Sequence, residues 1–111
     1  MKDSEFDLLL KETYDNLWNG RFRMALNSAK ILFDKDPYDT EINLIYAWAL
    51  LENGHPLKAM DYINSAVNLN SEPAKLHMIR GYLLSRICVF ENATKDFMTS
   101  VIKQRDMLAF T

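Results

Sequence analysis

The sequence predicts an all-α protein built from helical hairpins, with about six helices in all. Only three glycines and three prolines interrupt the 111 residues, which is too few for the many turns of a β-sheet protein. In addition, Ala25, Ala59 and Ala93 follow one another at a constant spacing of 34 residues (59 − 25 = 34; 93 − 59 = 34). A constant spacing of this size is typical of a repeated supersecondary unit.

Other positions repeat with the same period. Four further slots hold small, apolar or turn-forming residues in most units: Gly20, Gly54 and Cys88 at the turn; Thr13, Ala47 and Gly81; Ala29, Ile63 and Phe97; and Leu32, Ala66 and Ser100. The small residues let the paired helices approach closely. Neighbouring units are expected to stack, because one hairpin cannot cover its own apolar face.

The six expected helices are, in chain order, 5–18, 21–35, 40–53, 56–70, 73–87 and 90–105. Gly20 and Gly54 suit the left-handed residue that ends a helix. Pro56 and Pro73 suit the first turn of a helix, where the missing N–H is not needed. Two polar side chains are expected to cap helix N-termini: Asp39 and Ser71.

Three segments show the repeat most clearly: AWALLENGHPLKAMDYINSA in the middle, GYLLSRICVFENATKDFMTS in the last unit and NGRFRMALNSAKILFDKDP in the first. In its length and slot pattern the repeat resembles the tetratricopeptide repeat (TPR) family, with Pro37 in the closing proline slot. The resemblance covers almost the whole chain as three units, 5–37, 38–71 and 72–105, followed by a tail at 106–111. It implies a single domain with a right-handed, TPR-like α-solenoid fold.

The first expected helix departs from the family pattern at two positions. Glu12 and Asn16 stand where the family has a large apolar residue. Its apolar residues lie elsewhere: Phe6, Leu8, Leu9, Leu10, Tyr14, Leu17 and Trp18. This pattern indicates either a small slip in register or a different orientation of the helix.

In this family the first helix of each hairpin lines the concave side of the solenoid, so the resemblance implies which residues face a groove. They are mainly aromatic and aliphatic: Leu10, Tyr14, Leu17 and, as a further candidate, Trp18 from the first unit; Leu44, Ile45, Trp48 and Leu51 from the second; Met78, Ile79 and Tyr82 from the third. Glu41 and Glu52 are implied at the edges, together with Lys75 and Arg86, which are expected to be solvated.

An apolar groove predicts contact with a partner, because contiguous apolar surface marks interaction sites. The same residues also fit a closed hydrophobic core. For Leu10, Leu44 and Ile45 both interpretations stay open. Trp48 and Tyr82 favour contact with a partner, since aromatic residues are typical of binding hot spots.

One ligand known for the family is argued against. Some TPR domains hold the acidic C-terminal tails of heat-shock chaperones with a clamp of lysine, asparagine and arginine. Here the corresponding slots hold residues expected not to bind carboxylates: Leu10, Tyr14 and Ile79. Lys75 alone does not make a clamp.

Composition and motifs argue against several classes of function. A net charge of −2 provides no electrostatic footprint for nucleic acid. No apolar run approaches the roughly 18 residues of a membrane span and no secretory signal is seen, so we expect a cytoplasmic protein or a domain cut from a longer one. His55 and His77 have no partner at metal-ligand spacing, and no phosphate-binding loop occurs. No enzyme activity, cofactor or metal is expected.

The leading hypothesis is a non-enzymatic adaptor or scaffold that binds an apolar or amphipathic segment of a protein or peptide partner in its groove. A narrower alternative is a small bacterial secretion-type chaperone that masks a client helix, because some type III export chaperones are similar short TPR proteins. The other alternative is a self-assembling structural TPR protein, a homo-oligomer in which apolar faces pair.

Overall fold

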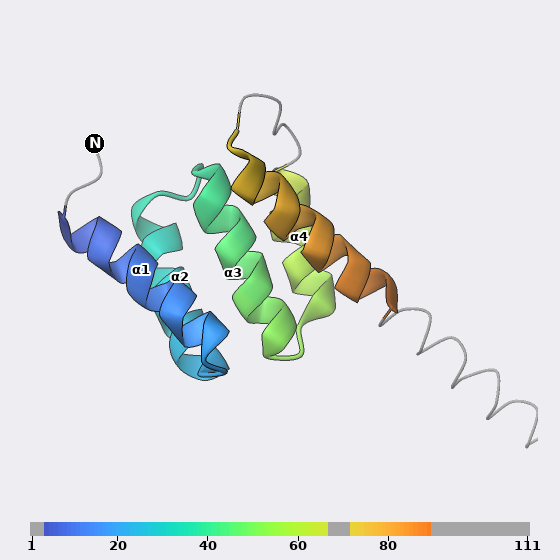
Figure 1. Ribbon diagram of the computed structural model, residues 1–111, viewed down its shortest axis with the longest axis horizontal. Coiled ribbons are helices and arrows are strands. Elements are labelled where there is room, and N and C mark those ends of the chain that lie inside the picture. Colours follow the sequence, from blue (N-terminus) through green and yellow to red (C-terminus); the bar gives the residue numbers. More distant parts are fainter. Residues whose placement is uncertain (1–3, 67–71, 90–111) are drawn as a thin grey trace, which may run out of the picture.

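The computed structural model describes residues 4–66 and 72–89 of the chain. These residues form helices joined by short turns, with no strand among them, and the predicted all-α class is confirmed. The helices are α1 (Ser4–Trp18), α2 (Phe22–Lys35), α3 (Thr40–Glu52) and α4 (Pro56–Ser65), followed by the helical residues 74–89, here called segment 74–89 (Figure 1).

The bounds predicted for the first three helices agree with the structure to within one residue. The fourth helix ends at Ser65, short of the predicted residue 70, and Ala66 leaves the helix with φ −104° and ψ 33°. The fifth predicted helix, 73–87, corresponds to segment 74–89. Three predicted features lie outside the described residues: the helix at 90–105, the N-cap at Ser71 and the small residue Ala93.

Gly20 and Gly54 end α1 and α3 as predicted, with φ of 77° and 85°. At the end of α3, the Gly54 N–H donates to the Leu51 carbonyl at 3.1 Å. The next N–H, that of His55, donates to the Leu50 carbonyl at 2.9 Å, and the same pair of bonds follows α1. In this Schellman arrangement a left-handed residue lets two successive N–H groups satisfy the last carbonyls of a helix.

The turn between α2 and α3 is held by two side chains. Asp39 caps α3 as predicted, since its Oδ1 accepts a hydrogen bond from the Ile42 N–H at 3.0 Å. Asn43 then donates through Nδ2 to the carbonyls of Pro37 and Asp39, at 2.9 and 2.8 Å. Pro56 lies in the first turn of α4, also as predicted.

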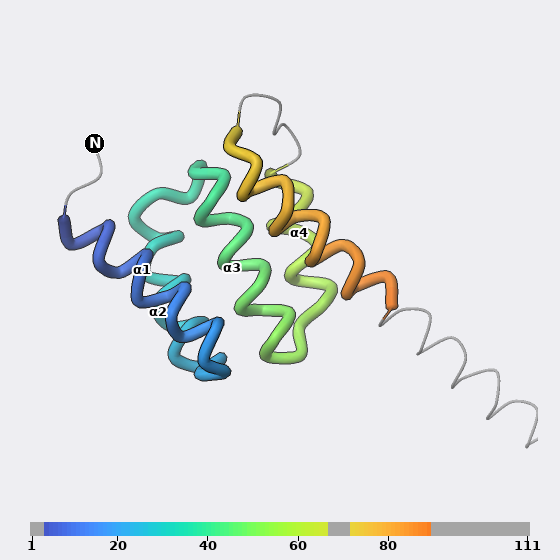
Figure 2. The backbone as a smooth tube through the Cα atoms, viewed as in Figure 1, coloured from blue at the N-terminus to red at the C-terminus, as the bar shows by residue number. Residues whose placement is uncertain are grey.

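Each helix packs against the next one in the sequence, and α1 also reaches α3. Segment 74–89 lies beside α3 and α4, and its Leu83 and Ile87 join the main core cluster (Figures 1 and 2). α3 is therefore the central helix, and nine of its 13 residues are buried. A helix covered on all sides is apolar all round, which the run from Leu44 to Leu51 satisfies.

The repeated small residues lie at the helix contacts. Ala25 and Ala59 are completely buried, as are Thr13 and Ala47. Small side chains at these positions let neighbouring backbones approach, which is what the repeat pattern predicts for them. Gly81, the third residue of the slot that holds Thr13 and Ala47, is exposed.

α1 keeps the register of the repeat in spite of its departures from the family pattern. Thr13 is buried at the same slot as Ala47, so no slip is needed. Asn16 is buried as well, and its Oδ1 accepts a hydrogen bond from Arg21 Nε at 2.9 Å. A buried amide is tolerated here because it is hydrogen-bonded. Glu12 points away from the core and is exposed.

Candidate functional site

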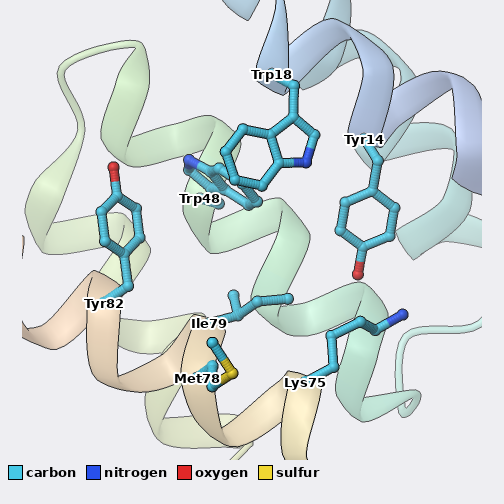
Figure 3. Close-up of a pocket in the computed structure, with 7 residues that line it drawn as sticks. All are labelled: Tyr14, Trp18, Trp48, Lys75, Met78, Ile79 and Tyr82. Atoms are coloured by element: carbon cyan, nitrogen blue, oxygen red, sulfur yellow. The ribbon is translucent and has the colours of Figure 1, made fainter.

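A groove with a volume of about 750 Å³ opens between α1, α3 and segment 74–89. We call it the aromatic groove; its lining residues are Tyr14, Trp18, Trp48, Lys75, Met78, Ile79 and Tyr82 (Figure 3). Trp48 of the central helix forms the floor, since it is only 6% exposed. Trp18 and Met78 stand on opposite walls and are 75% and 74% exposed. Such surface is hydrophobic, concave and open to solvent.

A row of aromatic rings crosses the groove from α1 to segment 74–89. The Trp18 and Trp48 ring centres are 5.4 Å apart with the ring planes at 90°. Trp48 and Tyr82 follow at 6.0 Å and 71°. Edge-to-face contacts of this kind place the positive edge of one ring against the negative face of the next. The row therefore sets the spacing of the three helices that line the groove.

At one end of the groove, three side chains from three helical elements meet at a single carboxylate oxygen. The Tyr14 hydroxyl donates to Glu41 Oε2 at 2.6 Å, and Lys75 Nζ lies 2.7 Å from the same oxygen. Lys75 Nζ also lies 5.2 Å from the centre of the Tyr14 ring. Burial, reinforced by the hydrogen bond to Glu41, raises the pKa of Tyr14 above its ordinary value. The phenol is therefore held in its neutral, donating form.

At the other end, Arg86 of segment 74–89 forms an ion pair with Glu52 of α3. Its guanidinium lies 5.6 Å from the centre of the Tyr82 ring, and Nη1 donates to the Tyr82 hydroxyl at 3.4 Å. Two ion pairs thus tie the central helix to segment 74–89, one at each end of the groove.

Half of the ten predicted groove residues line the aromatic groove. They are Tyr14, Trp48, Lys75, Met78 and Tyr82. Arg86 lies at one end through its contact with Tyr82. Lys75 and Arg86 are not free solvated charges, as the sequence suggested, because each pairs with a glutamate of α3.

The other four predicted groove residues lie in the core: Leu17, Leu44, Ile45 and Leu51. Leu44 packs with Ala66 and Leu76, and Ile45 packs with residues of α1 and α2. Of the two interpretations left open for them, the structure supports core packing. Because α3 has neighbours on all sides, only the part of its surface that carries Trp48 faces the groove.

The expectation that Tyr14 cannot bind a carboxylate is wrong. Its hydroxyl donates a short hydrogen bond to Glu41 of its own chain. Trp18 and Ile79, which stood at the margin of the prediction, both line the groove. A tyrosine at a groove slot was treated as an apolar ring, although its hydroxyl is a full hydrogen-bond donor.

A signal for this site was present in the sequence. Tyr14, Trp48 and Tyr82 occupy one slot of the repeat (48 − 14 = 34; 82 − 48 = 34). The two ion pairs have the same spacing, from Glu41 to Lys75 and from Glu52 to Arg86 (75 − 41 = 34; 86 − 52 = 34). Equivalent positions of stacked units lie side by side. An aromatic slot and two slots of alternating charge would therefore have predicted the row of rings and both ion pairs.

The described part of the chain offers little for metal chemistry or membrane insertion. Among residues 4–66 and 72–89, no three His, Cys, Asp or Glu side chains are grouped so that they could hold a metal ion. None of the helices in the same residues combines the length and apolar character needed to cross a membrane.

Neither protein-family models nor curated proteins nor solved structures give a match to this chain.

Proposed function

We propose that this chain is a non-enzymatic protein-interaction module that binds an apolar or amphipathic segment of a partner protein in the aromatic groove. The observation that carries the proposal is the groove itself. Four aromatic rings, Met78 and Ile79 line it, and Lys75 is its single charged lining residue. Concave surfaces of this composition are the usual sites for apolar ligands, and helix-lined grooves suit amphipathic helices.

The energy available from such contact is substantial. Covering the exposed three-quarters of Trp18 would remove on the order of 100–200 Å² from water, which is about 3–5 kcal/mol before the costs of association. Met78, 74% exposed on the facing wall, would add to this. The loss of translational and side-chain freedom offsets much of the gain. A net affinity in the micromolar range is therefore the reasonable expectation.

We further propose that the three helical pairs form a right-handed solenoid of TPR type. The constant spacing of 34 residues supports it, as do the equivalent Schellman turns at Gly20 and Gly54. The placement of α1, α3 and segment 74–89 around one groove is the arrangement expected when the first helices of stacked hairpins share a concave side.

A display selection with random 16-residue peptides tests the binding proposal. Wild-type protein should retain peptides rich in apolar residues, and Trp18→Ala should lose them. Trp18 is a better test than Trp48, because it is 75% exposed and its removal leaves the core intact. Leu57→Ala provides the matched control, since Leu57 on α4 is 78% exposed and lies outside the groove. Equal retention by Trp18→Ala and wild type would contradict the assignment of binding to this groove.

A homo-oligomer is the second candidate, because a second copy could cover Trp18 and Met78. Light scattering over a range of concentrations separates the two. A mass that doubles for the wild type but not for Trp18→Ala would favour self-association through the groove.

A further inference from the structure

The two ion pairs at the ends of the aromatic groove present the same sign of charge to solvent. In the first pair, the Lys75 side chain is 60% exposed and the Glu41 side chain 16%. In the second, Arg86 is 38% exposed and Glu52 only 11%. In both pairs the carboxylate is enclosed and the cation lies outside it. A ligand entering the groove therefore meets a cation at each end.

Both cations retain hydrogen-bonding capacity. A lysine ammonium has three N–H donors and an arginine guanidinium has five. Among the described residues, Lys75 pairs with one oxygen of Glu41, and Arg86 contacts Glu52 and the Tyr82 hydroxyl. Each side chain can therefore accept a second carboxylate without giving up its existing partner. Glu41 Oε2, by contrast, is already occupied by Tyr14 and Lys75.

The distance between the two cations defines a length for the ligand. Lys75 and Arg86 lie 11 residues apart on one helical segment (86 − 75 = 11). At a rise of 1.5 Å per residue this is about 16 Å. A helical ligand lying along the groove spans the same distance with the same number of residues.

Eleven residues at 100° each come to three turns plus about 20°, so positions i and i+11 of a helix lie on one face. Positions i+4 and i+7 lie between them on that face. An extended strand would cover about 16 Å in five residues, and positions i and i+5 of a strand point to opposite faces. A helix can meet both cations and the aromatic floor with one face, whereas a strand cannot.

We propose that the occupant of the aromatic groove is an amphipathic helix with an acidic residue at positions i and i+11 and apolar residues at i+4 and i+7. The inference rests on the proposed function of the groove and adds the charge and the spacing of its ligand. The apolar residues contact Trp18, Trp48 and Met78. The acidic residues pair with Lys75 and Arg86, which fixes the position of the helix along the groove.

The exposed acid Asp7 refines the geometry. It occupies the slot of α1 that corresponds to Glu41 and Lys75 (41 − 7 = 34), across the groove from segment 74–89. A like charge on that wall disfavours an acidic side chain there. The ligand's carboxylate is therefore directed towards Lys75.

The test uses a library of 18-residue helical peptides displayed on phage, with apolar residues at positions 7 and 10. Positions 3 and 14, which are 11 residues apart, are randomised among Glu, Lys and Ser. The full chain should enrich peptides with Glu at both positions, by about two- to fivefold at each end over Ser, because partly exposed ion pairs are modest. The preference should shrink in high salt.

Matched variants assign the preference to the two cations. Lys75→Gln combined with Arg86→Gln should abolish the selection for Glu, while Lys75→Arg combined with Arg86→Lys should keep it. Both positions are exposed enough that these changes leave the core untouched, which thermal unfolding followed by circular dichroism checks. Peptides with Glu at positions 3 and 10 are the control for spacing and should not be enriched.

The failures of the two proposals are distinguishable. Retention that depends on Trp18 but is equal for Glu, Ser and Lys overturns the acidic ligand and leaves the groove function standing. Retention that Trp18→Ala does not reduce, or no retention of any peptide, overturns the groove function itself. A dimer that Trp18→Ala dissociates, with no peptide retained, shows that a second copy occupies the groove and overturns both.

Discussion

The Tyr14 hydroxyl donates a 2.6 Å hydrogen bond to the Glu41 carboxylate, and this bond joins α1 to the central helix at one end of the aromatic groove. The same carboxylate oxygen pairs with Lys75. One oxygen therefore organises all three helical elements that line the groove. Stability and binding should both respond to changes at this point.

Replacement of Tyr14 by Phe should lower the free energy of unfolding by about 1–2 kcal/mol, because it removes a hydrogen bond to a charged, largely enclosed acceptor. Urea denaturation measures the loss. Tyr38→Phe is the control, since Tyr38 is 93% exposed in the turn before α3. Equal stability of Tyr14→Phe and wild type would show that the hydrogen bond contributes nothing.

The raised pKa of Tyr14 predicts a loss of stability in alkali. A tyrosine in the unfolded chain ionises near its ordinary pKa of about 10, while the folded state holds Tyr14 protonated to higher pH. Above about pH 10 the unfolded state therefore binds fewer protons than the folded state, and stability falls as pH rises. The stabilisation is complete below that pH. Wild type should lose more stability than Tyr14→Phe between pH 9 and 11; parallel curves would contradict the assignment.

The ion pair between Glu52 and Arg86 should be weak but measurable. A double-mutant cycle with Glu52→Gln and Arg86→Gln is expected to give a coupling energy of about 0.5–1 kcal/mol, because Arg86 is partly exposed. Salt at 1 M should reduce the coupling. A coupling that salt leaves unchanged would mean that packing of the side chains, and not charge, joins them.

Leu44 and Met78 stood together in the predicted groove set, but the structure separates them. Leu44→Ala should cost about 2–5 kcal/mol, because it empties a fully buried site. Met78→Ala should change stability by less than about 1 kcal/mol, because Met78 is 74% exposed, yet it should weaken peptide binding. Chemical denaturation and a peptide-binding titration on both variants check the assignment. The reverse order of stabilities would place Met78 in the core.

Two glycines offer an internally controlled test of the backbone. Gly54→Ala should destabilise the protein by about 1 kcal/mol, since its φ of 85° is strained for a residue with a Cβ although no atom blocks the space. Gly81→Ala should stabilise it by about 0.5–1 kcal/mol, because Gly81 lies within a helical segment and its Cβ would meet no neighbour. Thermal unfolding of both variants should give shifts of opposite sign.

Much of the site was within reach of the sequence, although not all of it was recognised. The 34-residue spacing identifies which helices share a face, and Tyr14, Trp48 and Tyr82 occupy one slot of that spacing. The slot does not reveal how far a helix is rotated about its axis. That rotation is why Ile45, next but two to Trp48, packs against α1 and α2 while Trp48 faces the groove.

By itself, the sequence determined the helices and the turns between them. These depend on local interactions: the left-handed conformation of Gly20 and Gly54, the cap at Asp39 and the fixed φ of Pro56. Only the tertiary structure decided which apolar residues became core and which became groove, and that the exposed cations enclose their glutamates. Burial and ion pairing depend on the rotation and separation of helices distant in the chain, which local preferences do not specify.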